Sequence, residues 1–367
     1  MSDTGSAEAD NEAKIDALVG VLQPLLAVLD GLQVVGRHLH PPQLPALAAR
    51  LEPLAEPLSD GLVPFRAIAW PEHQAGVVQC IETAADLAGR ALTGMREAAE
   101  HPDGIIQAYR ALRHTPRAMA TLYPLAANLQ PVSRFYLEAG ARDDADLIER
   151  LHAAGPSESQ VGVMHANNDR RSRGGFSVYV PEYYDASRTY PLIMALHGGS
   201  GHGQTFLWTW LREARSRGAI LVSPTSCGDT WSLMEPAIDS QSIEGILGQV
   251  CDQWAVDPEK LLLTGMSDGG TFCYVSGLRD ASPFTHLAPI SASFHPMMLE
   301  MIEQPRIKDR PIHLTHGTLD WMFAVDVART ASTVLAAAGA AIEYREISDL
   351  SHTYPNAENG DIMDWFL

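Results

Sequence analysis

Apolar positions recur every three or four residues along the first 155 residues, which is the spacing of amphipathic helices. The clearest stripe lies between residues 10 and 35 and consists of Ile15, Leu18, Val19, Leu22, Leu25, Leu26 and Leu29. Pro24 interrupts this stripe, so we expect a kinked helix or two shorter helices. Helical spacing returns at 74–100, 105–113 and 143–154. The pattern predicts an all-helical N-terminal domain over residues 1–158.

From about residue 160 the pattern changes to short apolar runs separated by helical stretches. The runs that predict strands are 161–165, 176–180, 192–196, 220–223, 261–264, 287–290, 312–315 and 342–347. The helical stretches are 205–216, 242–255, 270–278 and 327–338. This alternation predicts a second, α/β domain over residues 159–367, with a mostly parallel sheet of about eight strands and helices on both faces. The first two strands are expected to form an antiparallel hairpin at one edge.

The sequence Gly265-Met266-Ser267-Asp268-Gly269 lies between a predicted strand and a predicted helix. In this setting a G-x-S-x-G motif forms a sharp turn that holds the serine hydroxyl above the sheet. The glycines are required because strand and helix cross closely there and leave no room for a Cβ. We therefore predict that Ser267 is a nucleophile; the alternative is an ordinary turn of small residues.

A glycine-rich stretch, His197-Gly198-Gly199-Ser200-Gly201, follows the strand at 192–196. Acyl transfer places negative charge on a carbonyl oxygen in the transition state, and fixed backbone N–H groups must meet that charge. We expect one donor from this loop and one from the residue after the nucleophile. The predicted oxyanion hole is Gly199, with Ser200 as the alternative, together with Asp268. A glycine-rich turn without a ligand is the competing interpretation.

Two later predicted strands are followed by an aspartate and a histidine. Asp320 follows the strand at 312–315, and His352 follows the strand at 342–347. The order serine, aspartate, histidine is one of the chain orders in which catalytic triads occur. Because the carboxyl ends of parallel strands meet at one edge of a sheet, we predict that His352 is the base for Ser267 and Asp320 the acid that orients it.

Other candidates for these roles are weaker. Asp326 is expected to cap a helix, and Asp349 is too close in sequence to His352 to face it easily. His313 and His316 resemble a metal-binding pair, but residues three apart on a strand point to opposite sides. We therefore expect no metal site, and we expect His316 to brace the loop that carries Asp320.

Residues 160–367 resemble the phospholipase/carboxylesterase-type branch of the α/β-hydrolase superfamily, close to feruloyl-esterase and polyhydroxybutyrate-depolymerase-like enzymes. The resemblance rests on His197-Gly198-Gly199, the segment 265–270, the segment 316–320 and Ser351-His352. It implies the α/β-hydrolase fold and hydrolysis of a small-molecule ester through a covalent acyl-enzyme, without cofactor or metal. The chain departs from this family in its first 155 residues and in lacking a long cap insertion.

The same triad serves related chemistry, so a thioesterase or serine peptidase is the alternative enzyme. A catalytically silent binding protein that retains the fold is the alternative from another class. Ser200, Trp231 and Trp321 follow strands near the predicted catalytic edge and are expected to contact substrate, although the tryptophans can equally be core residues.

Composition narrows the function further. The net charge of −19 is spread over both halves of the chain, which excludes a basic surface for nucleic acid. The four cysteines show no C-x-x-C spacing, the N-terminus is acidic, and no apolar run appears long enough to span a bilayer. We expect a soluble cytoplasmic protein with no membrane partner. The apolar stripe at 10–35 needs a covering surface, which can be the other N-terminal helices, the α/β domain or a second chain. Of these we predict the second chain, in a homodimer through the N-terminal helical domain.

Overall fold

The computed structural model describes residues 3–154, 160–302 and 306–367. The chain divides into two compact units, Met1–Phe135 and Tyr136–Leu367. The boundary predicted between residues 158 and 159 lies outside the described residues. The units separate earlier than that because helix α8 (Ala145–Ala153) buries Leu147 and Leu151 with Leu137, and Tyr183 of the second unit packs against them.

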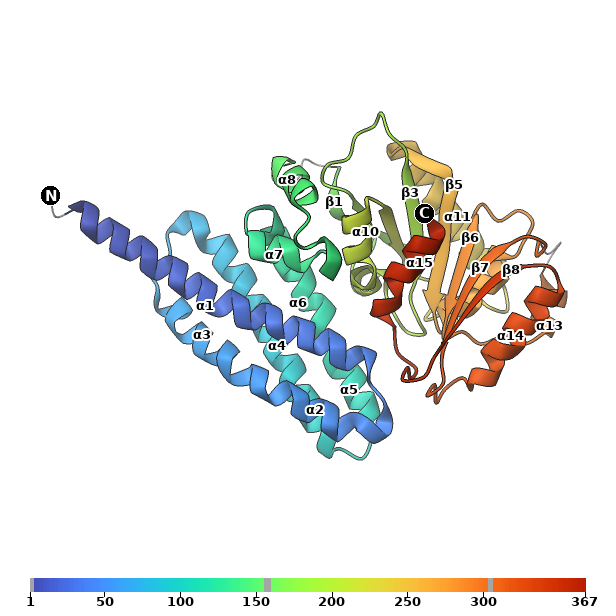
Figure 1. Ribbon diagram of the computed structural model, residues 1–367, viewed down its shortest axis with the longest axis horizontal. Coiled ribbons are helices and arrows are strands. Elements are labelled where there is room, and N and C mark those ends of the chain that lie inside the picture. The colour runs from blue at the N-terminus through green and yellow to red at the C-terminus, as the bar shows by residue number, and fades with distance from the viewer. Residues whose placement is uncertain (1–2, 155–159, 303–305) are drawn as a thin grey trace. The chain divides into compact units, whose positions relative to one another are not determined.

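The first unit is entirely helical in its described residues, as predicted (Figure 1). Its α-helices are α1 (Asp3–Arg37), α2 (Leu44–Leu51), α3 (Ala55–Ala67), α4 (Ala75–Glu100), α5 (Gly104–Leu112), α6 (His114–Leu122) and α7 (Gln130–Phe135). Helix α1 contacts α2, α3, α4 and α6. Most of the apolar stripe is therefore covered by helices of its own unit and not by a second chain.

The buried face of α1 differs in part from the predicted stripe. It consists of Ala17, Val21, Leu22, Leu25, Val28, Leu29, Leu32 and Val35. Two stripe residues are instead exposed, Ile15 at 52% and Val19 at 44%. The covering helices thus meet a face rotated from the predicted one, and this burial begins only at Ala17.

Helix α1 is continuous through Pro24, so of the two predicted alternatives the one with two shorter helices is wrong. Pro24 has no N–H to donate to the carbonyl of Gly20, four residues earlier. Gly61 of α3 lies against this carbonyl: a Cβ on Gly61 would be 2.2 Å from the Gly20 oxygen. The two helices therefore touch backbone to backbone beside the proline.

Residues Asp10–Arg37 are long and apolar enough to cross a bilayer by length and composition, contrary to the expectation stated above. Buried helices of soluble proteins share both properties, and α1 packs its inward face against its own unit.

The second unit contains one sheet in the order β1-β2-β4-β3-β5-β6-β7-β8. The strands are β1 (Gly162–Ala166), β2 (Phe176–Val180), β3 (Tyr190–Leu196), β4 (Ile220–Pro224), β5 (Val256–Met266), β6 (His286–Ile290), β7 (Pro311–Gly317) and β8 (Ala341–Ile347). Strand β2 pairs antiparallel with β1 and β4, and the other pairs are parallel. The predicted eight strands and the antiparallel edge hairpin are confirmed.

Helices cover both faces of this sheet, as predicted. They are α9 (Gly203–Phe206), α10 (Leu211–Arg217), α11 (Ala237–Gln253), α12 (Asp268–Gly277), α13 (Met297–Met301), α14 (Val325–Ala337) and α15 (Asn359–Phe366). Leu192 and Met194 of β3 share a core with Ile243 of α11. Ile193 and Ala195, which alternate with them, are also fully buried, on the opposite face. Helices α10 and α15 contact each other in front of the sheet (Figure 1).

The approach of α3 to α1 predicts opposite effects for two glycine substitutions. Gly61→Ala should destabilise the helical unit by roughly 1–3 kcal/mol, because the new methyl group must push the helices apart. Gly20→Ala is the matched control: its Cβ meets nothing within 4 Å, and it should stabilise the unit by about 0.5–1 kcal/mol. Urea unfolding followed by helical circular dichroism measures both changes. Equal effects of the two substitutions would contradict the close backbone contact.

Candidate active site

Ser267 lies on the turn between β5 and α12, with backbone angles φ 56° and ψ −120°. Residues other than glycine rarely adopt this conformation. A Cβ on Gly265 would be 2.6 Å from the Gly269 carbonyl carbon, and one on Gly269 would be 2.5 Å from the His197 oxygen. The strand and helix therefore cross as closely as the G-x-S-x-G motif predicts.

The three predicted side chains lie within hydrogen-bonding distance of one another. His352 Nε2 is 3.1 Å from Ser267 Oγ, and His352 Nδ1 is 2.8 Å from Asp320 Oδ2. The Asp320 side chain is fully buried and that of His352 is 5% exposed. An ionised carboxylate only accepts hydrogen bonds, so Nδ1 carries the proton and Nε2 faces the serine as an acceptor.

The environment of Asp320 favours its ionised form. Its Oδ1 accepts hydrogen bonds from the N–H groups of Met322 (2.9 Å) and Phe323 (2.8 Å). Burial by itself would raise the pKa of Asp320, but the hydrogen bonds from His352 and Phe323 outweigh it and leave this pKa below its ordinary value. Asp320 is thus a charged anchor for the imidazole at neutral pH.

Of the other candidates, only His316 lies beside this cluster, with its Nε2 3.5 Å from Asp320 Oδ2. Asp326 is in the first turn of α14, 81% exposed, and bound by Arg329. His316 Nε2 donates to the Phe323 carbonyl (2.9 Å), so His316 braces the loop that carries Asp320, as predicted. His313 approaches Glu343 at 3.7 Å instead. Within residues 3–154, 160–302 and 306–367, no group of three His, Cys, Asp or Glu side chains is arranged to hold a metal ion.

Two backbone N–H groups near Ser267 are free to donate. The Ser200 N–H donates to the Asp229 carbonyl (3.1 Å), whereas those of Gly199 and Asp268 meet no acceptor in the described part of the chain. A Cβ on Gly198 would be 3.5 Å from the Ser267 Cβ, so the glycine loop lies beside the serine. This geometry favours Gly199 over Ser200 as the loop's donor.

The unit therefore combines the eight-stranded sheet with a Ser-His-Asp cluster after β5, β8 and β7. Residues 160–367 have the α/β-hydrolase fold.

Comparison with known proteins finds relatives that are named as esterases. No protein-family model matches the chain. A probable feruloyl esterase C of Aspergillus oryzae is 27% identical over 144 residues, which are 37% of this chain and 52% of that protein. Feruloyl esterase C of Emericella nidulans is 30% identical over 119 residues, 30% of this chain and 44% of that protein. The chain thus spans about half the length of the curated relatives it matches.

Similar solved structures include a thermostable esterase and SOBER1 of Arabidopsis thaliana. The first is 20% identical, with 56% of this chain and 62% of that chain covered and a TM-score of 0.44. The second is also 20% identical, with 48% and 98% covered and a TM-score of 0.42.

In this α/β-hydrolase the glycine loop is held by a second loop, residues 225–232, which follows β4. The His197 Nδ1–H donates to the Gly198 carbonyl (2.7 Å), and its Nε2 accepts from the Ser226 N–H (3.1 Å). The indole N–H of Trp231 donates to the His197 carbonyl (2.7 Å). Thr230 donates to the Asp268 carboxylate (2.5 Å). The two predicted N–H donors are thus positioned by one shared support.

Arg173, in the connection between β1 and β2, joins the same two loops. Its Nε donates to the Gly228 carbonyl and its Nη1 to the Gly201 carbonyl, both at 2.8 Å. Its Nη2 donates to the Ser226 hydroxyl. Sequence reasoning missed Arg173 because no motif marks it and its partners lie far along the chain.

The side chains predicted to contact substrate differ in exposure. Trp231 is 2% exposed and stacks on Phe272, so it is a core residue behind the glycine loop and the prediction of substrate contact is wrong. Ser200 and Trp321 are exposed, Trp321 at 44% directly after Asp320. Their contact with substrate stays a prediction.

The hydrogen bonds of His197 require a neutral ring and predict a dependence of stability on pH. Burial lowers the pKa of His197 to about 4, below the roughly 6.5 of an unfolded histidine. The unfolded state therefore binds the proton more tightly between these values. The free energy of unfolding should be highest above pH 6.5 and fall by about 3 kcal/mol as pH decreases towards 4.

Urea unfolding of the wild type and of His197→Asn at pH 7 and pH 4.5 measures this contribution. The variant should be less stable at pH 7 but lose less stability on acidification. Equal losses in both proteins would show that another group is responsible.

Proposed function

We propose that the protein is a serine carboxylesterase that hydrolyses small-molecule esters through a covalent acyl-enzyme. The observation that carries this proposal is the hydrogen-bonded series from Ser267 Oγ through both ring nitrogens of His352 to buried Asp320. The similarity to proteins named feruloyl esterase supports an ester as the substrate.

In the proposed reaction, His352 Nε2 takes the proton of Ser267 as Oγ attacks the ester carbonyl carbon. Asp320 keeps the imidazole in the required tautomer and stabilises the imidazolium that forms. The N–H groups of Gly199 and Asp268 bind the negatively charged oxygen of the tetrahedral intermediate. His352 then protonates the leaving alcohol, and a water molecule releases the acid by the reverse steps.

Arg173 places a positive charge behind the glycine loop, where it favours negative charge on the substrate oxygen. Its hydrogen-bond acceptors are two carbonyl oxygens and one hydroxyl, and it makes no ion pair among the described residues. Its positive charge is therefore not neutralised by a carboxylate, and it favours negative charge developing nearby. The positive charge of Arg173 also counteracts the negative charge of the Asp268 carboxylate. This carboxylate lies close to Gly199, since a Cβ on Gly199 would be 2.7 Å from Asp268 Oδ2.

Ser267→Ala tests the nucleophile. Ester hydrolysis should fall by roughly 10⁴–10⁶-fold in kcat and labelling by a fluorophosphonate should disappear, because the hydroxyl that lies 3.1 Å from His352 Nε2 is removed. Ser187→Ala, on an exposed loop, is the matched control and should keep both. Ester, thioester and amide substrates that share one acyl group, such as feruloyl, should be hydrolysed at rates that decrease from the ester to the thioester to the amide. A Ser267→Ala enzyme that keeps a tenth of the wild-type kcat would refute the assignment.

Asp320→Asn tests the acid. The amide cannot hold the Nδ1–H tautomer of His352 as a carboxylate does, so kcat should fall by roughly 10⁴-fold. Asp326→Asn makes the same chemical change at an exposed aspartate and should leave kcat within about twofold of the wild type. Steady-state hydrolysis by both variants decides between the two, and the opposite ranking would transfer the orienting role to Asp326.

A further inference from the structure

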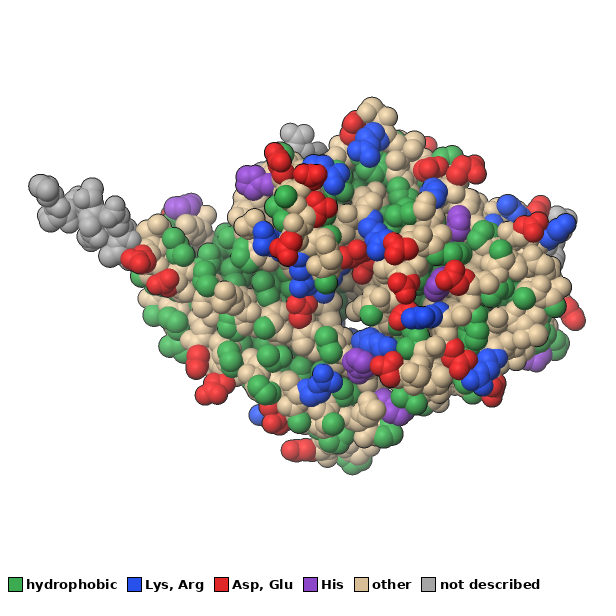
Figure 2. Space-filling model, in the orientation of Figure 1, with side chains coloured by type: hydrophobic (Ala, Val, Ile, Leu, Met, Phe, Trp, Pro, Cys, Tyr) green, Lys and Arg blue, Asp and Glu red, His purple; other side chains and the backbone are tan. Residues whose placement is uncertain are grey.

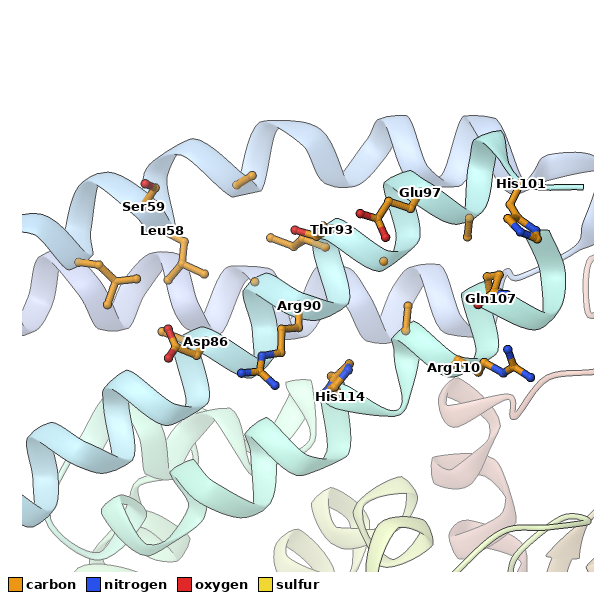
Figure 3. Close-up of a pocket in the computed structure, with 18 residues that line it drawn as sticks. Leu58, Ser59, Asp86, Arg90, Thr93, Glu97, His101, Gln107, Arg110 and His114 are labelled. Atoms are coloured by element: carbon orange, nitrogen blue, oxygen red, sulfur yellow. The ribbon is translucent and has the colours of Figure 1, made fainter. Parts of the chain in front are cut away.

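The helical unit carries a groove of about 990 Å³ along α4, which we call the α4 groove (Figure 3). Helix α3 forms one wall, with the apolar side chains of Leu58 and Leu62. The other wall is formed by α5 and the start of α6, with Arg110 and His114, and Arg90 projects from the floor (Figure 3). The groove is thus apolar on one side and cationic on the other.

Two arginines of the α4 groove lack acidic partners among the described residues. Arg90 and Arg110 make no ion pair among the residues that the structure describes. Of the acids that line the groove, Asp86 is bound by Arg66 of α3 at 3.2 Å, and Glu97 lies farther along the floor. Two unpaired arginines beside an apolar wall, in a chain of net charge −19, favour an acidic, partly apolar occupant.

Residues 10–19 of α1, in the same unit, form an exposed helical segment that is acidic and partly apolar. Glu12, Ile15, Asp16 and Val19 share one face of the helix, at spacings of three and four. Ile15 and Val19 are exposed, and Glu12 and Asp16 make no ion pair within the described residues. Figure 2 shows acidic side chains beside hydrophobic ones where the coloured part of α1 begins. A helical segment without a tertiary partner is marginal in water.

We propose that the chain forms a two-fold symmetric dimer in which the segment 10–19 of each copy lies in the α4 groove of the other. Ile15 and Val19 would face the wall of Leu58 and Leu62. Glu12 and Asp16 would face Arg90 and Arg110. In this dimer the segment 10–19 and the α4 groove of each copy are both covered. No such surface is left to bind a third copy, so the assembly stops at two.

The dimensions agree with such an exchange. The α4 residues that line the groove run from Ala85 to Ala98, a length of about 20 Å, and the ten-residue segment is about 15 Å long. Eighteen residues line the groove; with the segment, each copy would contribute a number within the range of about 20–30 residues a side found in stable interfaces. The proposal does not depend on the esterase function.

Two double charge reversals in the full-length chain test the dimer. Arg90→Glu with Arg110→Glu should give a monomer by light scattering, because the groove then repels the acidic segment. Glu12→Lys with Asp16→Lys should also give a monomer. An equimolar mixture of the two variants should dimerise again, since each segment then meets a groove of opposite charge. Arg50→Glu with Glu56→Lys, at exposed positions outside the groove, is the matched control and should remain dimeric.

Circular dichroism checks that each variant is folded. If a reversal unfolds the protein, the salt dependence of the wild type decides: raising NaCl from about 0.05 to 0.5 M should weaken its dimer at least tenfold through screening of these pairs. A wild type that is monomeric at tens of micromolar overturns the proposal. So does a dimer that is unaffected by the charge reversals or, where these cannot be read, by salt.

Discussion

The close crossing of β5 and α12 is the constraint on which the candidate site depends. It requires a turn in which Ser267 adopts backbone angles that cost on the order of 1–3 kcal/mol. Hydrogen bonds hold this turn on both sides, from the Ser267 N–H to the Ile290 carbonyl (3.0 Å) and from the Thr271 N–H to the Ser267 carbonyl (2.8 Å). The same turn directs the Ser267 hydroxyl at His352 and leaves the Asp268 N–H without an acceptor in the part of the chain that the structure describes. One local distortion therefore positions both a nucleophile and a donor.

The glycine loop after β3 has no comparable constraint of its own, because glycines restrict the backbone least. Its shape comes instead from polar contacts with residues 225–232 and with Arg173. These contacts depend on the protonation state of His197: a neutral ring accepts from the Ser226 N–H and a protonated one cannot. The loop that would bind the oxyanion is thus linked to the protonation of a residue one position before its first glycine.

The sequence alone was sufficient for the strands and for the positions of Ser267, Asp320 and His352, because each of these side chains lies in the connection that follows a strand and the parallel sheet brings strand ends together. It was not sufficient for Arg173 or Trp231. The Arg173 contact with Gly228 joins residues 55 apart, and no periodicity marks either partner. Trp231 was assigned to the substrate site because an aromatic residue near a strand end is typical of both a pocket and a core, and only its burial separates the two.

In the helical unit, too, some features could not be predicted from the sequence, but for a different reason. Spacing in the sequence identified α1 but neither its buried face nor its passage through Pro24, since both depend on the neighbouring helices. A proline inside a helix costs roughly 3 kcal/mol and leaves one carbonyl without its donor. Eight buried apolar side chains on α1 offset this cost. The Gly61 hydrogen that occupies the position of a Cβ points at the Gly20 oxygen, a weak C–H donor that meets the orphaned carbonyl. A glycine on α3 thus compensates for a proline on α1, and this relation is visible only once the two helices are packed.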